Sequence, residues 1–301
     1  MMNARLSLPT ALLLTIPPLM WAGNAVVGRV VGPMVPPMTL NLLRWALAAL
    51  FLLPLAASVL QPGSGLWSHW RRFSLLGLLS VGGYNALQYL ALHTSTAINV
   101  TLVAASTPVW MLLIGRSFFG ARISTRQWLG AALSLSGVLL VLSRGELDIL
   151  LKLRLVPGDF YVLLASVAWA FYSWMLTQPG KDPASIRSNW ATFLMAQIVF
   201  GLGWSALFAA GEWALTDARI LWSWPLAAAL LFIALGPALL AYRCWGAGVS
   251  RAGPTLASFF ANLTPLFAAL LSSALLGETP HAYHVIAFGL LVGGIVVSAR
   301  R

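Results

Sequence analysis

Residues 97–143 read AINVTLVAASTPVWMLLIGRSFFGARISTRQWLGAALSLSGVLLVLS, and the same pattern returns 157 positions later in residues 254–300, PTLASFFANLTPLFAALLSSALLGETPHAYHVIAFGLLVGGIVVSAR. In each copy an apolar helix with a Thr-Pro dipeptide in its middle is predicted to run into a glycine, and a second apolar helix follows after a short polar turn. The dipeptides and glycines are Thr107-Pro108 with Gly120, and Thr264-Pro265 with Gly277. The recurrence of this helix pair indicates a chain built from two related halves.

The composition places the chain in a lipid bilayer. Hydrophobic residues make up 59% of the chain and charged residues only 8%, whereas about a quarter of an ordinary soluble domain is charged. The net charge is +11, but the basic residues stand singly or in pairs at the ends of apolar runs, which favours a role in membrane topology over a nucleic-acid site. The single cysteine, Cys244, has no partner for a disulfide or a zinc site. We therefore expect a membrane protein without a nucleic-acid partner, metal or cofactor.

Apolar stretches of about 20 residues, the length that crosses the hydrocarbon core as a helix, occur ten times. They predict an all-α integral membrane protein with ten transmembrane helices, and the first stretch is interpreted as a retained helix, not a signal peptide. The predicted spans are 9–30, 38–60, 73–92, 97–117, 126–143, 158–177, 189–210, 225–247, 254–276 and 282–299.

Lysine and arginine residues indicate the orientation, because cytoplasmic loops retain them. With the N-terminus inside, twelve of these residues flank the inner ends of the predicted spans and six flank the outer ends. We therefore expect both termini in the cytoplasm. Arg44 lies a turn or two inside the second span, where it is expected to snorkel to the outer interface. Binding a substrate carboxylate is the less favoured alternative for this residue.

Five spans in each half have a geometric consequence, since an odd number of crossings reverses direction. The halves, residues 9–143 and 158–300, are therefore predicted to be inverted five-helix repeats around a central cavity, with residues 144–157 as an external connector. Many secondary transporters are built from inverted repeats with a shared central site. This analogy at the level of the fold favours transport without proving it.

Polar and aromatic side chains within the spans are candidates for the lining of this cavity, because polar groups at membrane depth usually face the bundle interior. Their spacing places several of them on common helix faces. We expect the first, third, fourth, sixth, eighth and ninth spans to surround the cavity. The expected substrate-binding residues are Trp21, Asn24, Tyr84, Gln88, Trp169, Tyr172, Ser173, Tyr242, Ser258 and Asn262.

These candidates have structural alternatives. Small-residue stripes such as the one that includes Ser258 are more often packing seams between membrane helices. Trp21 and Trp169 are explained equally well by packing between helices, and an interhelical hydrogen bond would satisfy Asn262. The prolines Pro108 and Pro265 each remove a backbone hydrogen bond, so we expect a kink or hinge at these positions.

The chain lacks the features of several other classes. All seven acidic residues lie in loops or at the ends of predicted spans, so no buried carboxylate is available for a proton relay, and downhill transport is expected. The sequence has no HExxH, nucleophile elbow or P-loop motif, which argues against an enzyme and against an ATP-driven pump. No run of residues is typical of a channel filter. An intramembrane enzyme that uses an isolated Ser or Tyr remains an open alternative.

The paired stretch resembles the EamA repeat of the drug/metabolite transporter superfamily. In that family the repeat ends in a Leu-Gly-Glu turn, which a helix of Gly-x-x-Leu-x-x-x-Gly character follows. The second copy reads Leu276-Gly277-Glu278 and then Phe288-Gly289-Leu290 to Gly294, whereas Ala121 stands in place of the glutamate in the first copy. Residues 21–24, Trp-Ala-Gly-Asn, are similar to the family's first helix.

Within the superfamily the chain is most similar to the YddG-type amino-acid exporters of the bacterial inner membrane. The resemblance implies export of amino acids, aromatic ones included, with broad specificity, without ATP and by alternating access. It also implies a multi-pass protein of the inner membrane, surrounded by lipid, and we expect a monomer. The alternatives are an exporter of other small metabolites or of aromatic cationic drugs, for which the same Trp and Tyr side chains would serve, and more remotely a channel.

Overall fold

A computed structural model of the chain describes residues 6–95, 97–152, 154–276 and 282–299. All regular secondary structure within these ranges is helical. Eight helical stretches of the described residues are long and apolar enough to cross a membrane. The other two predicted spans, 73–92 and 158–177, are also formed by helices. The prediction of an all-helical membrane protein is confirmed.

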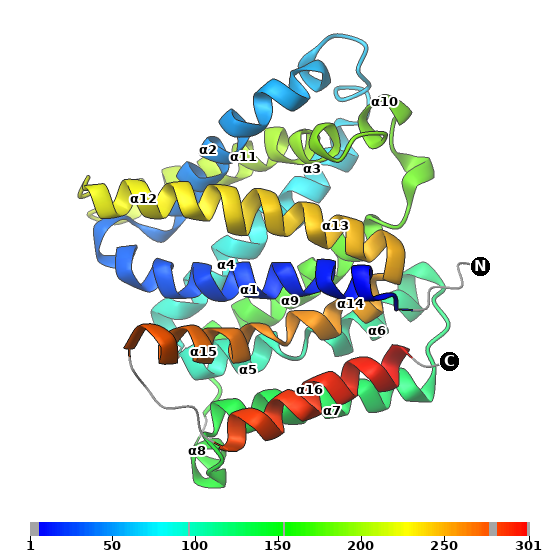
Figure 1. Cartoon of the computed structure of the whole chain (residues 1–301). Helices are drawn as coiled ribbons and strands as arrows, with labels where there is room; N and C mark the ends of the chain where they lie inside the picture. Colours follow the sequence, from blue (N-terminus) through cyan, green and yellow to red (C-terminus); the bar gives the residue numbers. More distant parts are fainter. Residues whose placement is uncertain (1–5, 96, 153, 277–281, 300–301) are drawn as a thin grey trace.

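The helices of the first half run back and forth through the bundle and are joined by short connections (Figure 1). They are α1 (Leu8–Val31), η1 (Gly32–Met34), α2 (Pro37–Ala56), η2 (Ala57–Leu60), α3 (Trp70–Gly77), η3 (Leu78–Gly82), α4 (Gly83–Thr94), α5 (Ala97–Ala104), α6 (Thr107–Phe119) and α7 (Thr125–Leu142).

The second half follows a connecting segment that contains the short helix α8 (Leu147–Leu151). Its elements are α9 (Pro157–Met175), η4 (Pro179–Lys181), α10 (Ala184–Arg187), α11 (Trp190–Leu215), α12 (Trp224–Ile233), η5 (Ala234–Leu240), α13 (Ala241–Ala252), α14 (Pro254–Ala261), α15 (Thr264–Leu276) and α16 (Ala282–Ala299). The start of α1 and the end of α16 lie at the same end of the bundle (Figure 1).

Each Thr-Pro dipeptide begins a new helix. Within each predicted span the helix is interrupted by a two-residue turn, because α5 ends at Ala104 before α6 begins at Thr107, and α14 ends at Ala261 before α15 begins at Thr264. Proline lacks an N–H group and its ring clashes with the preceding turn. The threonine hydroxyl of each dipeptide donates to the last carbonyl of the helix before it, at 2.6 Å in the first half and 2.7 Å in the second.

The polar turn between α6 and α7 is defined by its end residues. Gly120 ends α6 in the left-handed conformation, with a φ of 64° that glycine adopts without strain. Ser124 and Gln127 then form a capping box, in which each side chain accepts from the other residue's backbone N–H, at the start of α7. The glycine expected in the second copy, Gly277, lies outside the described residues.

Two π-helical turns, η3 and η5, interrupt the third and eighth predicted spans. A π turn widens the helix by one residue and is often found at functional sites. Pro237 lies within η5, where its missing N–H removes a helical bond. Tyr84 and Tyr242 follow soon after the two turns, so the irregular backbone lies next to two of the expected site residues.

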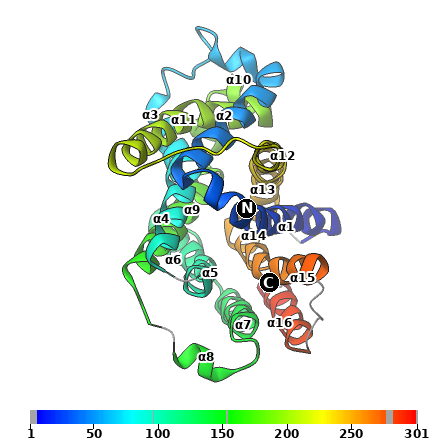
Figure 2. The ribbon, with the colours of Figure 1, turned by 90° about the vertical axis from the view of Figure 1, so that its left-hand side faces the viewer.

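Helices far apart in the sequence pack against one another, and between one pair of them glycines bring the two backbones together. The helix α7 packs along α16, and α2 packs along α11 (Figures 1 and 2). A Cβ atom added to Gly130 on α7 would lie 2.7 Å from the carbonyl oxygen of Gly294 on α16, and one added to Gly294 would lie 2.7 Å from the Gly130 carbonyl oxygen. The two backbones therefore touch, as small residues permit in membrane helices.

Candidate functional site

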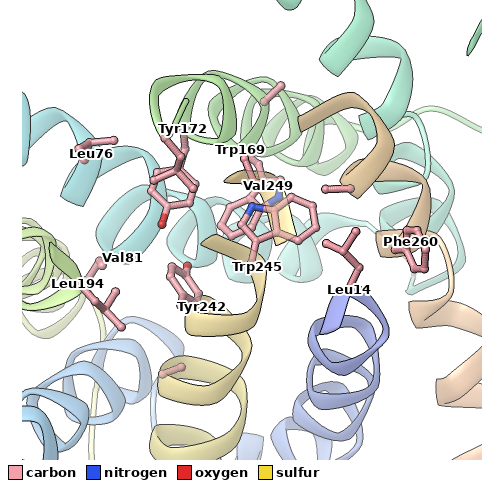
Figure 3. Packing of buried hydrophobic residues seen from close by; sticks show 14 of the residues in the cluster. Leu14, Leu76, Val81, Trp169, Tyr172, Leu194, Tyr242, Trp245, Val249 and Phe260 are labelled. Carbon is pink, nitrogen blue, oxygen red and sulfur yellow. The ribbon is translucent and has the colours of Figure 1, made fainter. Parts of the chain in front are cut away.

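Six aromatic side chains from four helices meet inside the bundle, and Figure 3 labels four of them, Trp169, Tyr172, Tyr242 and Trp245. We call them the aromatic cluster. They are Trp21 on α1, Tyr84 on α4, Trp169 and Tyr172 on α9, and Tyr242 and Trp245 on α13.

Trp169 contacts all five other rings of the cluster. Its ring centre lies 5.4 Å from that of Trp21, 4.8 Å from Tyr84, 5.0 Å from Tyr172, 5.6 Å from Tyr242 and 5.3 Å from Trp245. These separations are typical of attractive aromatic pairs. The residues of α9 and of α13 are each three positions apart, which places both rings of each helix on one face. The helix faces predicted from spacing are therefore brought together here.

Neutral polar groups border the cluster. Trp245 Nε1 donates to Ser173 Oγ at 3.2 Å, and Gln88 Nε2 donates to the Tyr84 hydroxyl at 2.9 Å. The amide oxygen of Asn24, one turn beyond Trp21 on α1, is buried and accepts no hydrogen bond from the described residues. This oxygen is an acceptor that an ammonium or amide group of a ligand could satisfy.

Asn262 and Ser258 make their hydrogen bonds elsewhere. Asn262 Nδ2 donates to the Ala105 carbonyl at 3.1 Å and to Ser134 Oγ at 2.9 Å. Ser258 is fully buried, and its hydroxyl donates within its own helix to the carbonyl of Thr255. The interhelical alternative thus describes Asn262 in this conformation, and substrate contact by either residue stays a prediction.

The structure adds Trp245, which sequence reasoning missed, and it corrects the expected position of Arg44. Trp245 lies three positions after Tyr242, so the helix face that carries Tyr242 was a signal for it. Arg44 is only 2% exposed, and its Nη1 donates to Asn85 Oδ1 at 3.3 Å. The expectation that Arg44 snorkels to the outer interface is wrong, because its side chain is directed into the protein toward α4.

A groove of about 860 Å³ lies on another face of α4. From α4 it is lined by Gly83, Ala86, Leu87 and Leu90, and its remaining walls come from the α1–α2 turn, η3, α9, α11 and the segment after α11. None of the ten predicted substrate-binding residues lines it. The groove is mostly apolar and is separate from the aromatic cluster.

Described carboxylates are buried only near helix ends. The fully buried Asp182 side chain pairs with Arg72 of α3 and, at 3.2 Å, with Arg187 of α10. In the first turn of α9, Asp159 accepts from the Val156 N–H and from Asn99 Nδ2, both at 2.9 Å. These positions agree with the prediction that acidic residues lie at the ends of spans.

The model of the EamA-like transporter family matches the chain twice, over residues 8–143 and 156–300. An uncharacterized transporter of Archaeoglobus fulgidus is 24% identical over 295 residues, which cover 97% of this chain and 98% of that one. The uncharacterized inner membrane transporter YedA of Escherichia coli K12 is 27% identical over 228 residues, covering 74% and 69% of the two chains.

Two further comparisons concern function and fold. The aromatic amino acid exporter YddG of Ancylobacter novellus is 23% identical over 247 residues, covering 81% of this chain and 80% of that one. A protein of known crystal structure has the same fold, with a TM-score of 0.75, 22% identity and 96% coverage of each chain.

Proposed function

The chain belongs to the EamA-like transporter family, and from this premise we propose that it exports amino acids, aromatic ones included, across the cytoplasmic membrane. The transport is secondary, driven without ATP, and broad in specificity. The observation that most supports this proposal is the aromatic cluster, in which both halves of the chain supply rings around Trp169. Aromatic faces bind apolar side chains and attract an ammonium group.

The neighbouring amides suit the polar end of an amino acid. The unpartnered Asn24 oxygen accepts from an ammonium group, and Gln88 offers both a donor and an acceptor beside Tyr84. The proposed binding residues remain Trp21, Asn24, Tyr84, Gln88, Trp169, Tyr172, Ser173 and Tyr242, with Ser258 and Asn262 as more distant members. The relative from Ancylobacter novellus, an aromatic amino acid exporter, supports this choice of substrate.

Alternating access is proposed to arise from ten helices arranged as two inverted five-helix repeats, residues 9–143 and 158–300. The helix breaks at Thr107 and Thr264 and the π turns η3 and η5 support this arrangement, because each pair occurs at matching places in the two halves. Repeats of this kind can exchange roles between inward-open and outward-open states. The breaks before Pro108 and Pro265 are the proposed hinges.

The proposed orientation places both termini in the cytoplasm, with residues 144–157 outside. The excess of Lys and Arg on the inner flanks supports it. The start of α1 and the end of α16 lie at one end of the bundle, as an even number of crossings requires (Figure 1).

Transport assays in liposomes test the proposal. The purified protein is expected to take up labelled phenylalanine and threonine saturably, and unlabelled amino acids are expected to inhibit this uptake. Uptake of methylviologen without amino-acid uptake would indicate a drug exporter instead. If phenylalanine, threonine and methylviologen were all not taken up, export of amino acids and of cationic drugs would both be overturned. Accumulation of substrate driven by a pH gradient alone would contradict downhill transport.

A further inference from the structure

A group of buried polar side chains lies beside the aromatic cluster, on α2 and α4. It consists of Arg44, Trp45 and Asn85, which are 2%, 0% and 7% exposed, and we call it the Arg44 group. Arg44 Nη1 donates to Asn85 Oδ1 at 3.3 Å, and its Cζ lies 5.3 Å from the centre of the Trp45 ring. Arg44 comes seven residues after Pro37, the first residue of α2, so it lies about 10 Å along the helix.

Among the residues that the structure describes, no carboxylate forms an ion pair with the guanidinium group of Arg44. Every ion pair found among the described residues belongs to another arginine or lysine. A buried charge without a partner is strongly unfavourable, and ionisable side chains at membrane depth usually mark a pathway for substrates or ions. Retaining an unpaired arginine here therefore requires an explanation beyond packing.

Three hydrogen-bond donors of the Arg44 group also lack an acceptor in the described part of the chain. They are Arg44 Nε, Trp45 Nε1 and Asn85 Nδ2. Buried donors are rarely left unsatisfied in native proteins. A cation surrounded by surplus donors is suited to an anion. Guanidinium matches a carboxylate especially well, because two parallel N–H groups can donate to its two oxygens.

We infer that the Arg44 group binds the carboxylate of the transported molecule. This inference rests on the proposed function and deepens it, because it names the residues that bind the carboxylate that every amino-acid substrate carries. The Trp45 ring meets Tyr242 edge to face, with ring centres 4.9 Å apart, and Tyr242 belongs to the aromatic cluster. A carboxylate at Arg44 therefore has the cluster next to it, where an aromatic side chain and an ammonium group find rings.

The conformation described is closed around Arg44, so the anion reaches the site at another stage of the transport cycle. An occluded stage of this kind is part of alternating access. The neutral members of the aromatic cluster contribute no charge that distinguishes a carboxylate from an amide. Arg44 is thus the residue expected to make that distinction.

Binding to the unmodified full-length protein in detergent provides the first test, with four ligands that share a phenyl ring. Phenylalanine and 3-phenylpropionate carry the carboxylate, whereas phenylalaninamide and phenethylamine do not. Phenylalanine and 3-phenylpropionate are expected to bind about tenfold or more tightly than phenylalaninamide and phenethylamine. The loss of one charge-assisted hydrogen bond weakens binding by about this factor. Equal affinity for phenylalanine and its amide would overturn the inference, and this comparison needs no variant.

Variants then test the residue. R44Q is expected to bring the affinity for phenylalanine down to that for phenylalaninamide, while the affinity for the amide stays the same. R44K is expected to recover part of the difference, because it restores the charge without the planar fork. R29Q, at an exposed arginine near the end of α1, is the matched control and should leave all four affinities unchanged. A loss of equal size for the acid and the amide in R44Q would show a structural role and overturn the inference.

The same ligands separate this inference from the proposed function. Phenylalanine and phenylalaninamide could be taken up into liposomes at equal rates and bind with equal affinity. That result would agree with amino-acid export but contradict a carboxylate site at Arg44. Tight, Arg44-dependent binding of 3-phenylpropionate without amino-acid uptake would support the carboxylate site and overturn amino-acid export.

Discussion

The side-chain amide of Asn262 donates to the backbone carbonyl of Ala105, the residue 157 positions earlier. The offset equals that between the two copies of the repeated pattern, so the two residues occupy equivalent places in the two halves. Both lie in a helix break, between α5 and α6 and between α14 and α15. Helix ends leave backbone carbonyls without a partner, and here one half of the chain satisfies such a carbonyl of the other.

Replacing Asn262 with alanine should lower stability because it leaves the Ala105 carbonyl and the Ser134 hydroxyl without this donor. The expected loss is about 1–2 kcal/mol, in the range measured for hydrogen bonds in proteins and membrane helices. Thermal unfolding of the detergent-purified protein measures it. The control is S136A, which removes an exposed hydroxyl on α7 that bonds only within its helix. Equal melting temperatures for N262A and S136A would contradict the structural role.

Removing the ring at the centre of the aromatic cluster should abolish most transport. W169A deletes a side chain that contacts five other rings, and W169F is expected to keep part of the flux because it retains one ring. Uptake of labelled phenylalanine into liposomes, normalised to monodisperse protein, is the measurement. W222A serves as the control, since Trp222 is 64% exposed. Normal phenylalanine uptake by W169A would show that the aromatic cluster is not part of the transport pathway.

Adjacent glycines on α16 should respond differently to the same substitution. A Cβ atom at Gly294 would lie 2.7 Å from the Gly130 carbonyl oxygen, whereas one at Gly293 would meet nothing within 4 Å. G294A is expected to cost about 1–3 kcal/mol, as overpacking does, while G293A is neutral or slightly stabilising because alanine favours helix. Thermal unfolding compares the two variants. Similar melting temperatures would mean that α7 and α16 do not pack as closely as described.

The buried carboxylate of Asp182 should be needed to hold two arginines together. Burial lowers the pKa of the Arg187 guanidinium, and the carboxylate raises it again. D182N removes that compensation and leaves Arg72 and Arg187 in a partly buried site, which should cost about 3 kcal/mol. D148N is the matched control, because Asp148 pairs with Lys152 at the exposed surface, where ion pairs contribute little. A melting temperature of D182N within error of D148N would contradict this account.

Much of the architecture follows from local sequence. The predicted spans agree with helices of the structure to within a few residues at most ends, because about 20 apolar residues in succession have few alternatives to a membrane helix. Gly120 was predicted as a helix end for a similar local reason, since glycine accepts the left-handed conformation there. The break before Thr107 was predicted only as a kink. Whether proline bends or ends a helix depends on which neighbours accept the freed backbone groups.

The candidate site was predicted in part. Spacing placed Trp169 and Ser173 on one helix face with Tyr172 beside them, and the structure brings the rings of Trp169 and Tyr172 into the aromatic cluster. Trp245 was missed although it lies three positions after Tyr242 in the regular helix α13, a spacing that places both side chains on one face. The hydrogen bonds of Asn262 to Ala105 and Ser134 could not be predicted, because a residue type alone does not identify its partners.

The sequence by itself determined the class of protein, the positions of its helices and the residue types available for binding, since these depend on hydrophobicity and spacing along the chain. Only the tertiary structure decided that Arg44 is buried against α4 and that Asn262 joins the two helix breaks. Both outcomes depend on how helices distant in sequence are rotated and packed, and the energy of a buried polar group is set by the partners that this packing brings to it.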